Sequence, residues 1–182
     1  MRKSNKEAAE TRRAIVAAAA DHIRRTGIAE ASLADIMAGA GLTHGGFYKH
    51  FRDREQLIAE ALVAAGEAAA EKLSEIRSEK GLNAALDSYL SADHRDAETP
   101  TCPMGALGSE AARGSGRTRA AAAAVIERMI GILAEDASSA EVRGEALVDY
   151  ATMVGAITLA RIVSGTPLSD EILDRTRRRL HR

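Results

Sequence analysis

The sequence predicts an all-α fold, and three observations support this prediction. Alanine and aliphatic residues supply most of the 46% apolar content, whereas aromatic residues make up only 3%. Alanine and leucine favour helices, and the 182-residue chain contains only three prolines to interrupt them. Apolar residues recur at the spacing of a helical face, and no segment alternates convincingly as a β-strand does.

Charge is distributed unequally along the chain. Residues 1–54 hold ten Lys or Arg and six Asp or Glu, whereas the remainder is acidic and the whole chain has a net charge of −1. A basic N-terminal third suits phosphate binding. The alternative is that the unequal distribution of charge arises by chance. No apolar run reaches the roughly 18 residues of a membrane span. The charged N-terminus is not a secretory signal, and one cysteine forms no disulfide within the chain. We therefore expect a cytoplasmic protein with no membrane contact.

Residues 1–53 are predicted to form a first domain of three helices. The first helix, over about residues 7–25, has an apolar face at helical spacing: Ile15, Ala19 and Ile23. Ser32 starts a second, short helix, with an acidic residue three positions later that resembles a capping box. Gly41 ends it, and Thr43 is expected to cap a third short helix over residues 44–50.

Residues 54–182 are predicted to form a second, larger helical domain. Asp53 caps a long helix that ends at Gly81. A loop is expected over residues 91–104, because this stretch combines charged residues with two prolines. The other helices are expected over about residues 82–90, 105–113, 118–136, 140–164 and 169–180.

The stretch from residue 32 to residue 51, SLADIMAGAGLTHGGFYKHF, has the pattern of a helix-turn-helix. Two short helices flank Gly41, a residue that tolerates a positive φ. Six apolar positions are able to close one small core: Leu33, Ile36, Met37, Leu42, Phe47 and Phe51. The second helix keeps a polar outer edge, as a recognition helix does. Gly45 and Gly46 are poor helix formers, which indicates either close approach to DNA or tight packing between the helices.

Residues 15–62 closely resemble the TetR family of bacterial repressors. The resemblance rests on the block ADIMAGAGLTHGGFYKHF, which ends in Tyr48-Lys49-His50-Phe51, and on the following FRDREQLIAEAL. Arg54 stands where many members carry lysine. The resemblance implies an N-terminal three-helix helix-turn-helix domain plus a C-terminal helical domain for ligand binding and dimerisation. It also implies a protein that is not an enzyme and holds no metal or cofactor.

Double-stranded operator DNA is the expected partner of the first domain. Thr43, His44 and Gly45 are candidates for base edges, because the start of a recognition helix enters the major groove. Phosphate contacts are expected from Ser32, Thr43, Tyr48, Lys49, His50 and Arg54; the family resemblance gives this role to Tyr48 and His50. A solvated or structural imidazole is the alternative for His44 and His50. The N-terminal Arg2, Lys3 and Lys6 either add contacts to DNA or form a tail.

A homodimer is expected, because one helix-turn-helix domain, here called the head, reads one half-site of an operator. Helices over about 118–136 and 140–164 of two copies would form a four-helix bundle, with small residues allowing close approach: Ala151, Gly155 and Ala156. The alternative is that these small residues pack in the hydrophobic core of a single copy. The family resemblance implies a small apolar or amphipathic effector that releases the operator. Its candidate contacts, each equally suited to plain core, are Leu62, Leu86, Tyr89, Leu90, Met104, Leu107, Met129 and Tyr150.

Cys102 adds a second possibility for the effector. The segment TCPMGAL resembles the cysteine-glycine block of one TetR subgroup, in which some members sense electrophiles or oxidants, although Thr101 stands where glycine is usual. A cysteine that opens a helix favours the thiolate form. An electrophilic effector that reacts with Cys102 is therefore an alternative to an inert, half-buried thiol.

Two rival functions use other features of the chain. Five neighbouring residues offer groups for catalysis or metal binding: Asp93, His94, Asp96, Glu98 and Cys102. They lie in one short stretch with no supporting motif, which argues against an enzyme and against a metal site. The second rival is a helical ligand-binding or scaffold protein without DNA binding, which the basic first domain and the pair Tyr48 and His50 argue against.

Overall fold

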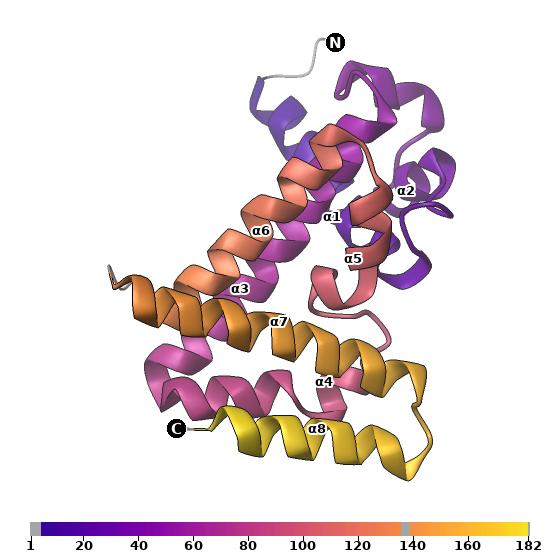
Figure 1. Cartoon of the computed structure of the whole chain (residues 1–182). Helices are drawn as coiled ribbons and strands as arrows, with labels where there is room; N and C mark the ends of the chain where they lie inside the picture. The colour runs from indigo at the N-terminus through magenta and orange to yellow at the C-terminus, as the bar shows by residue number, and fades with distance from the viewer. Residues whose placement is uncertain (1–4, 136–138, 182) are drawn as a thin grey trace.

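The computed structural model describes residues 5–135 and 139–181, and every regular element in this part of the chain is helical. The elements are α1 (Asn5–Thr26), α2 (Leu33–Gly39), the 3₁₀ helix η1 (His44–Lys49), α3 (Arg54–Tyr89), α4 (Ala92–Asp96), α5 (Pro103–Arg113), α6 (Gly116–Ala134), α7 (Ala140–Ile162) and α8 (Pro167–Leu180). Figure 1 shows α1 and α2 at one end of the molecule and α8 at the opposite end. The all-α prediction is confirmed.

The N-terminal helices enclose the small core that the sequence predicts. Ile36, Met37, Phe47 and Phe51 are buried, and Leu33 and Leu42 pack against them with part of their surface exposed. The predicted face of α1, formed by Ile15, Ala19 and Ile23, is also buried. The hydroxyl of Ser32 accepts a hydrogen bond from the backbone N–H of Asp35 at 3.1 Å, and Gly41 has a φ of +70°. Both predicted boundaries of the turn are therefore present.

The third short helix, predicted over residues 44–50, is present over residues 44–49 as a 3₁₀ helix. Two glycines in succession lower the helix propensity of this segment by about 2 kcal/mol relative to alanine. A tight 3₁₀ helix is commonly used for such short pieces.

α3 is interrupted at Gly81, which has a φ of +84° and a ψ of 173°. The predicted break at this glycine is confirmed. The predicted loop over residues 91–104 was wrong in part, because Ala92–Asp96 form the short helix α4. The hydroxyl of Ser91 accepts a hydrogen bond from the backbone N–H of His94 at 3.1 Å, and this N-cap stabilises the first turn.

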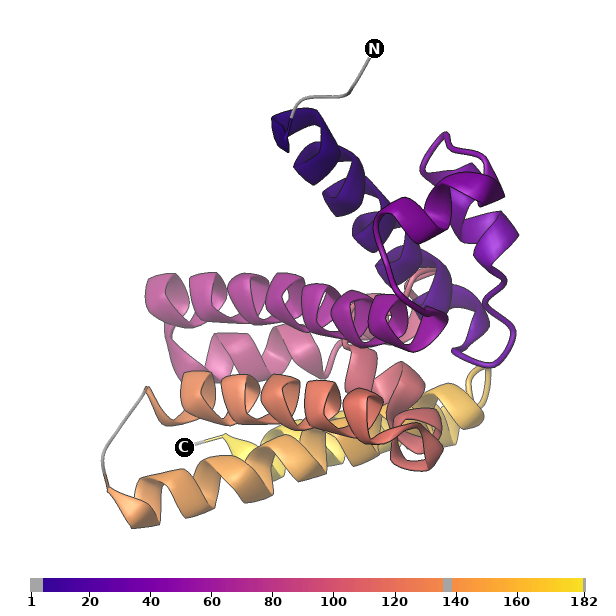
Figure 2. The ribbon, with the colours of Figure 1, turned by 90° about the horizontal axis from the view of Figure 1, so that it is seen from above.

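The C-terminal helices pack in sequence around α3. α3 packs against α6, α6 against α7, and α7 against α8, and Figure 2 shows α3 and α6 lying side by side. Gly66 of α3 lies at this crossing, since a Cβ atom added to it would stand 2.3 Å from a Cγ atom of Val125 in α6. The missing side chain of Gly66 is thus what allows the two helices to approach so closely. No helix in the described part of the chain is long and apolar enough to cross a membrane.

We predict that Gly66→Ala destabilises the protein, because its methyl group overlaps Val125. The free energy of unfolding should fall by about 1–3 kcal/mol, measured by urea denaturation. The double variant Gly66→Ala/Val125→Ala should lose less than the sum of the two single variants. Gly108→Ala is the matched control, since an added Cβ there meets no atom within 4 Å. Equal effects of Gly66→Ala and Gly108→Ala would contradict the close contact.

Candidate DNA interface and effector cavity

Neighbouring aromatic residues of η1 point to opposite sides. Phe47 is fully buried, whereas the side chain of Tyr48 is 69% exposed. The two rings meet edge to face with centroids 5.1 Å apart. Thr43, His44, Gly45 and Lys49 are exposed as well. The 3₁₀ helix therefore presents to solvent most of the residues that the sequence assigned to DNA.

Neither the side chain of Thr43 nor the space beside Gly45 is used to cap or pack η1. The side chain of Thr43 makes no capping hydrogen bond, although the residue occupies the N-cap position of η1. A Cβ atom added to Gly45 would meet nothing within 4 Å, and one added to Gly46 would stand 3.6 Å from the Met37 side chain. Packing within the chain therefore does not require glycine at position 45, which favours the other interpretation of this pair, close approach to a partner.

Three other predicted phosphate contacts have internal bonds. The hydroxyl of Ser32 donates to a carboxylate oxygen of Asp35 at 2.6 Å. The guanidinium of Arg54 donates to the backbone carbonyl of Ala31 at 2.9 Å and to that of Ile28. His50 is half-buried, and its carbonyl accepts from Nε of Arg12 at 3.4 Å. Arg54 thus joins the start of α3 to the segment between α1 and α2.

Arg12 has a connecting role that the sequence analysis missed. Its guanidinium lies 4.7 Å from the centre of the Phe51 ring and donates to Glu60 of α3 at 2.6 Å. Only the pairing of α1 with α3 in three dimensions brings these residues together. Among the N-terminal basic residues, Lys6 is exposed on α1, and Arg2 and Lys3 lie outside the described residues.

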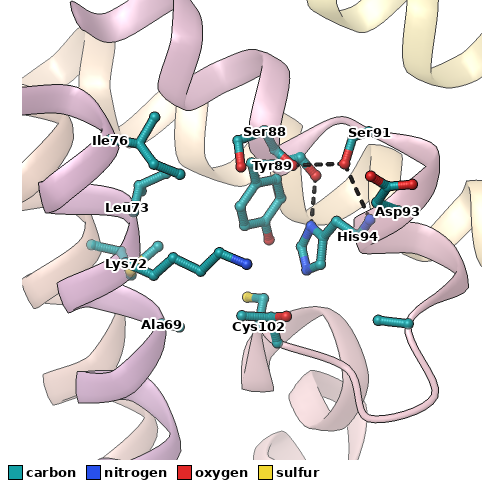
Figure 3. Close-up of a pocket in the computed structure, with 13 residues that line it drawn as sticks. Ala69, Lys72, Leu73, Ile76, Ser88, Tyr89, Ser91, Asp93, His94 and Cys102 are labelled. Carbon is teal, nitrogen blue, oxygen red and sulfur yellow. Dashed lines mark hydrogen bonds between the residues drawn. The ribbon is translucent and has the colours of Figure 1, made fainter. Parts of the chain in front are cut away.

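A cavity of about 330 Å³ lies between α3, α4, the start of α5 and α6. Its apolar wall includes Leu73, Ile76 and Met129, and its polar side includes Lys72, Tyr89, His94 and Cys102. Figure 3 shows the side chains of Lys72, Tyr89 and His94 turned toward the same part of the cavity. This volume is at the lower end of the range for small-molecule sites, about 300–1,000 Å³.

The polar side of the cavity is uncharged apart from Lys72 and Asp93. Nδ1 of His94 lies 2.6 Å from the backbone carbonyl of Tyr89. Burial of the ring lowers the pKa of His94 below its ordinary value, so the neutral form dominates at pH 7. Burial also raises the pKa of Tyr89 well above its ordinary value, and the phenol keeps its proton.

The predicted effector contacts are divided among three environments. Tyr89, Cys102 and Met129 line this cavity. Met104 and Tyr150 line a second, more open groove of about 610 Å³ between α5, α6 and α7. Four leucines are core residues at most 1% exposed and are not among those lining either space: Leu62, Leu86, Leu90 and Leu107. Cys102 is 2% exposed, and its sulfur lies 3.8 Å from the hydroxyl of Tyr150.

The polar residues of the cavity include several that the sequence analysis did not assign to an effector: Lys72, Ser88, Ser91, Asp93 and His94. A start signal for α4 was present in the sequence, because Ser91 is a favourable N-cap residue. Recognising that helix would have placed His94 in its first turn, but not against α3. No group of three or more His, Cys, Asp or Glu residues in the described part of the chain is arranged to hold a metal ion.

Two hydrogen bonds connect the segments on either side of Cys102 to the N-terminal part of the chain. Nη1 of Arg24, in α1, donates to the carbonyl of Pro100 at 3.3 Å. The backbone N–H of Ala29 donates to a carboxylate oxygen of Glu110, in α5, at 2.9 Å. The loop that precedes Cys102 and the helix that follows it are therefore both in direct contact with the N-terminal unit.

Comparison with known proteins identifies the family. A family model for bacterial regulatory proteins of the tetR family matches residues 15–61. The HTH-type transcriptional regulator TtgR of Pseudomonas putida is 40% identical over 58 residues, which are 32% of this chain and 28% of that protein. The HTH-type transcriptional repressor BepR of Brucella suis biovar 1 is 43% identical over 54 residues, 30% of this chain and 26% of that protein. The matches thus span about a quarter of each relative.

A solved structure extends the similarity to the C-terminal helices. A TetR transcriptional regulator from Chloroflexus aurantiacus J-10-FL has a TM-score of 0.76 and 26% identity, with 96% of this chain and 94% of that chain covered. Residues 15–61 therefore belong to the TetR family, and the chain as a whole has the fold of a TetR regulator. The reduced form of Escherichia coli NemR shares the fold, with a TM-score of 0.78, 22% identity, and coverage of 94% and 95%. The TetR fold therefore includes the helices around both cavities.

We predict that Arg54 of this TetR-family chain stabilises the N-terminal unit through its bonds to the carbonyls of Ile28 and Ala31. Arg54→Ala should lower the free energy of unfolding by about 1–3 kcal/mol, measured by urea denaturation. The control Arg52→Ala, at an exposed neighbouring position, should change it by less than about 0.5 kcal/mol. Unchanged stability together with weaker DNA binding in Arg54→Ala would instead assign Arg54 to a phosphate.

Proposed function

We propose that this TetR-family chain is a homodimeric transcriptional repressor that binds a palindromic operator and is released by a small effector. The observation that carries the proposal is the arrangement of η1, in which a fully buried Phe47 holds exposed Thr43, His44, Gly45 and Tyr48 on the outer surface. Such a segment is able to enter the major groove with its first residues at the base edges. BepR, which shares 43% identity over 54 residues, is named as a repressor.

Roles in this proposal differ among the exposed residues. Thr43, His44 and Gly45 read bases, and Tyr48 and Lys49 contact phosphates. The remaining three residues contribute mainly by fixing the protein backbone next to the DNA. The side chains of Ser32 and Arg54 and the carbonyl of His50 form hydrogen bonds within the chain. The boundary between residues 1–53 and 54–182 separates the reading head from the effector and dimerisation helices.

The exposed apolar surface of α7 supports a dimer. Leu147, Val148, Leu159 and Ile162 are between 49% and 73% exposed, and Ala151 and Gly155 lie exposed between them. A contiguous apolar surface of this kind marks an interaction site, and the proposed occupant is the same surface of a second copy together with α6. Ala156 does not belong to this interface as the sequence suggested, because it is 6% exposed and packs inside its own chain.

The position of the cavity supports release by an effector. The loop before Cys102 and the helix α5 after it are bonded to α1 and to the segment after α1 through Arg24 and Glu110. An effector that prefers one arrangement of these helices would shift the spacing of the two heads and thereby lower operator affinity. A reactive Cys102 would act from the same cavity.

DNA binding is tested by selecting bound fragments from random or genomic DNA with the purified protein. We predict that Lys49→Ala weakens binding similarly across sequences and lowers the slope of log affinity against log salt by about one per copy.

We also predict that Gly45→Ala weakens binding to the selected site more than binding to unrelated DNA, because its methyl group faces the bases. Gly116→Ala, at a position with equal open space, is the control. A protein that enriches no sequence and shows no salt dependence would support the scaffold alternative.

We predict that Leu159→Glu dissociates the dimer, because it places a charge within the exposed apolar surface of α7. The dimer dissociation constant should rise at least about tenfold, measured by analytical ultracentrifugation. Leu168→Glu is the matched control, since Leu168 is similarly exposed at 51% but lies on α8. A wild-type protein that sediments as a strict monomer at micromolar concentration would refute the dimer.

A further inference from the structure

The cavity between α3, α4 and α5 contains two buried polar atoms that have no hydrogen-bond partner. These atoms are the hydroxyl oxygen of Tyr89 and Nε2 of His94. Tyr89 is only 6% exposed, and both side chains line the cavity. Unpaired polar groups in a protein interior cost free energy and are rare. Their occurrence together at the wall of one cavity indicates that a ligand completes their bonds.

The hydrogen-bonding capacity of His94 is fixed by its neighbours. A backbone carbonyl only accepts hydrogen bonds, so Nδ1 of His94 carries the proton that it shares with the carbonyl of Tyr89, 2.6 Å away. In the neutral ring Nε2 is then an acceptor. Arg161 of α7 donates to the carbonyl of His94 at 2.9 Å, which fixes α4 against α7. The acceptor is therefore held in place before a ligand arrives.

These two atoms set a simple requirement for the ligand. Nε2 of His94 needs a donor, and the protonated hydroxyl of Tyr89 needs an acceptor for its hydrogen. A hydroxyl group meets both needs with one oxygen atom. A carbonyl or an ether only accepts, and a hydrocarbon satisfies neither atom. The requirement thus excludes purely apolar ligands as the best fit.

The apolar residues that line the cavity indicate what the rest of the ligand is like. Ala69, Leu73 and Ile76 of α3 and Met129 of α6 form an apolar surface opposite α4. A water molecule also satisfies the two polar atoms, but it leaves this surface uncovered. A hydrocarbon body that carries a hydroxyl replaces the bonds of such a water and buries apolar area as well. The volume of about 330 Å³ restricts that body to a small one.

We propose that the cavity binds a small hydroxylated hydrocarbon, a phenol or an alcohol, whose hydroxyl donates to Nε2 of His94 and accepts from the hydroxyl of Tyr89. The exposed side chain of Lys72 extends toward the same point (Figure 3), and it turns outward when the ligand enters. Binding is non-covalent and does not require Cys102. The inference rests on the proposed function only in treating this ligand as the effector.

Calorimetric titration of the full chain without DNA tests the proposal with matched probes. 4-Ethylphenol and 4-ethylcyclohexanol carry a hydroxyl on an aromatic and an aliphatic body, whereas ethylbenzene lacks it and 4-ethylanisole only accepts. At least one hydroxylated probe should bind about tenfold or more tightly than both ethylbenzene and 4-ethylanisole. The comparison between the two hydroxylated probes then assigns the ligand as a phenol or an alcohol.

Tyr89→Phe separates a ligand-binding hydroxyl from a structural one. Because the hydroxyl lacks a partner, its removal should leave the melting temperature unchanged or raised, while affinity for the hydroxylated probe falls about tenfold. Thr176→Val, which removes a hydroxyl from α8, should change neither affinity nor specificity. The intact mass of the wild-type protein should be unchanged after incubation with the hydroxylated probe, because binding is non-covalent.

Equal affinities for 4-ethylphenol, 4-ethylcyclohexanol and ethylbenzene would overturn the proposal. A lower melting temperature of Tyr89→Phe with unchanged affinity would also overturn it, since the hydroxyl would then be structural. These measurements contain no DNA, so failure to bind an operator does not affect them. Conversely, a hydroxylated probe that binds as expected but leaves an operator complex intact would refute effector release and leave the ligand site established.

Discussion

The arrangement of the DNA-binding surface depends on the burial of Phe47 and Phe51 between α1, α2 and α3. Their rings are stacked with centroids 5.5 Å apart and planes at 20°, and the guanidinium of Arg12 covers Phe51. Each buried phenylalanine contributes about 1.5–3 kcal/mol. With Phe47 fixed inside, the short 3₁₀ helix has only one possible orientation, and the next residue, Tyr48, must face outward. Without the buried Phe47, the conformation of this segment would depend on Gly45 and Gly46, which are poor helix formers.

Local signals in the sequence were sufficient for most of the fold. Ser32 and Asp53 are caps because each side-chain oxygen accepts from an N–H group only three residues later in the sequence. Gly41 and Gly81 end helices because their positive φ angles disfavour other residues. These features depend on a few consecutive residues, so they can be recognised without knowledge of the tertiary structure. α4 followed the same rule through Ser91, but the charge around it resembled a loop.

The effector cavity was less predictable, for a physical reason. Leu86 and Tyr89 both suit the buried face of a helix, yet Leu86 is core and Tyr89 borders a cavity. Helical periodicity identifies which face is buried, but it does not show whether the opposing helices fill the space in front of that face. Lys72 and His94 line the same cavity only because the chain changes direction at Gly81, where α3 breaks. Contacts of this kind depend on packing, which a single sequence does not reveal.

Contacts across the boundary at residue 53 explain how a small cavity could influence a distant DNA surface. Asp53 bonds Arg117 of α6 at 2.8 Å, and Glu110 of α5 bonds the backbone of Ala29 at 2.9 Å. The head is therefore bonded to the same two helices that, together with α3 and α4, form the cavities. A shift of α5 on ligand binding cannot occur without moving Ala29 or breaking its hydrogen bond. Under the proposed release by an effector, coupling free energies are reciprocal, so operator DNA would weaken ligand binding by the same factor by which the ligand weakens DNA binding.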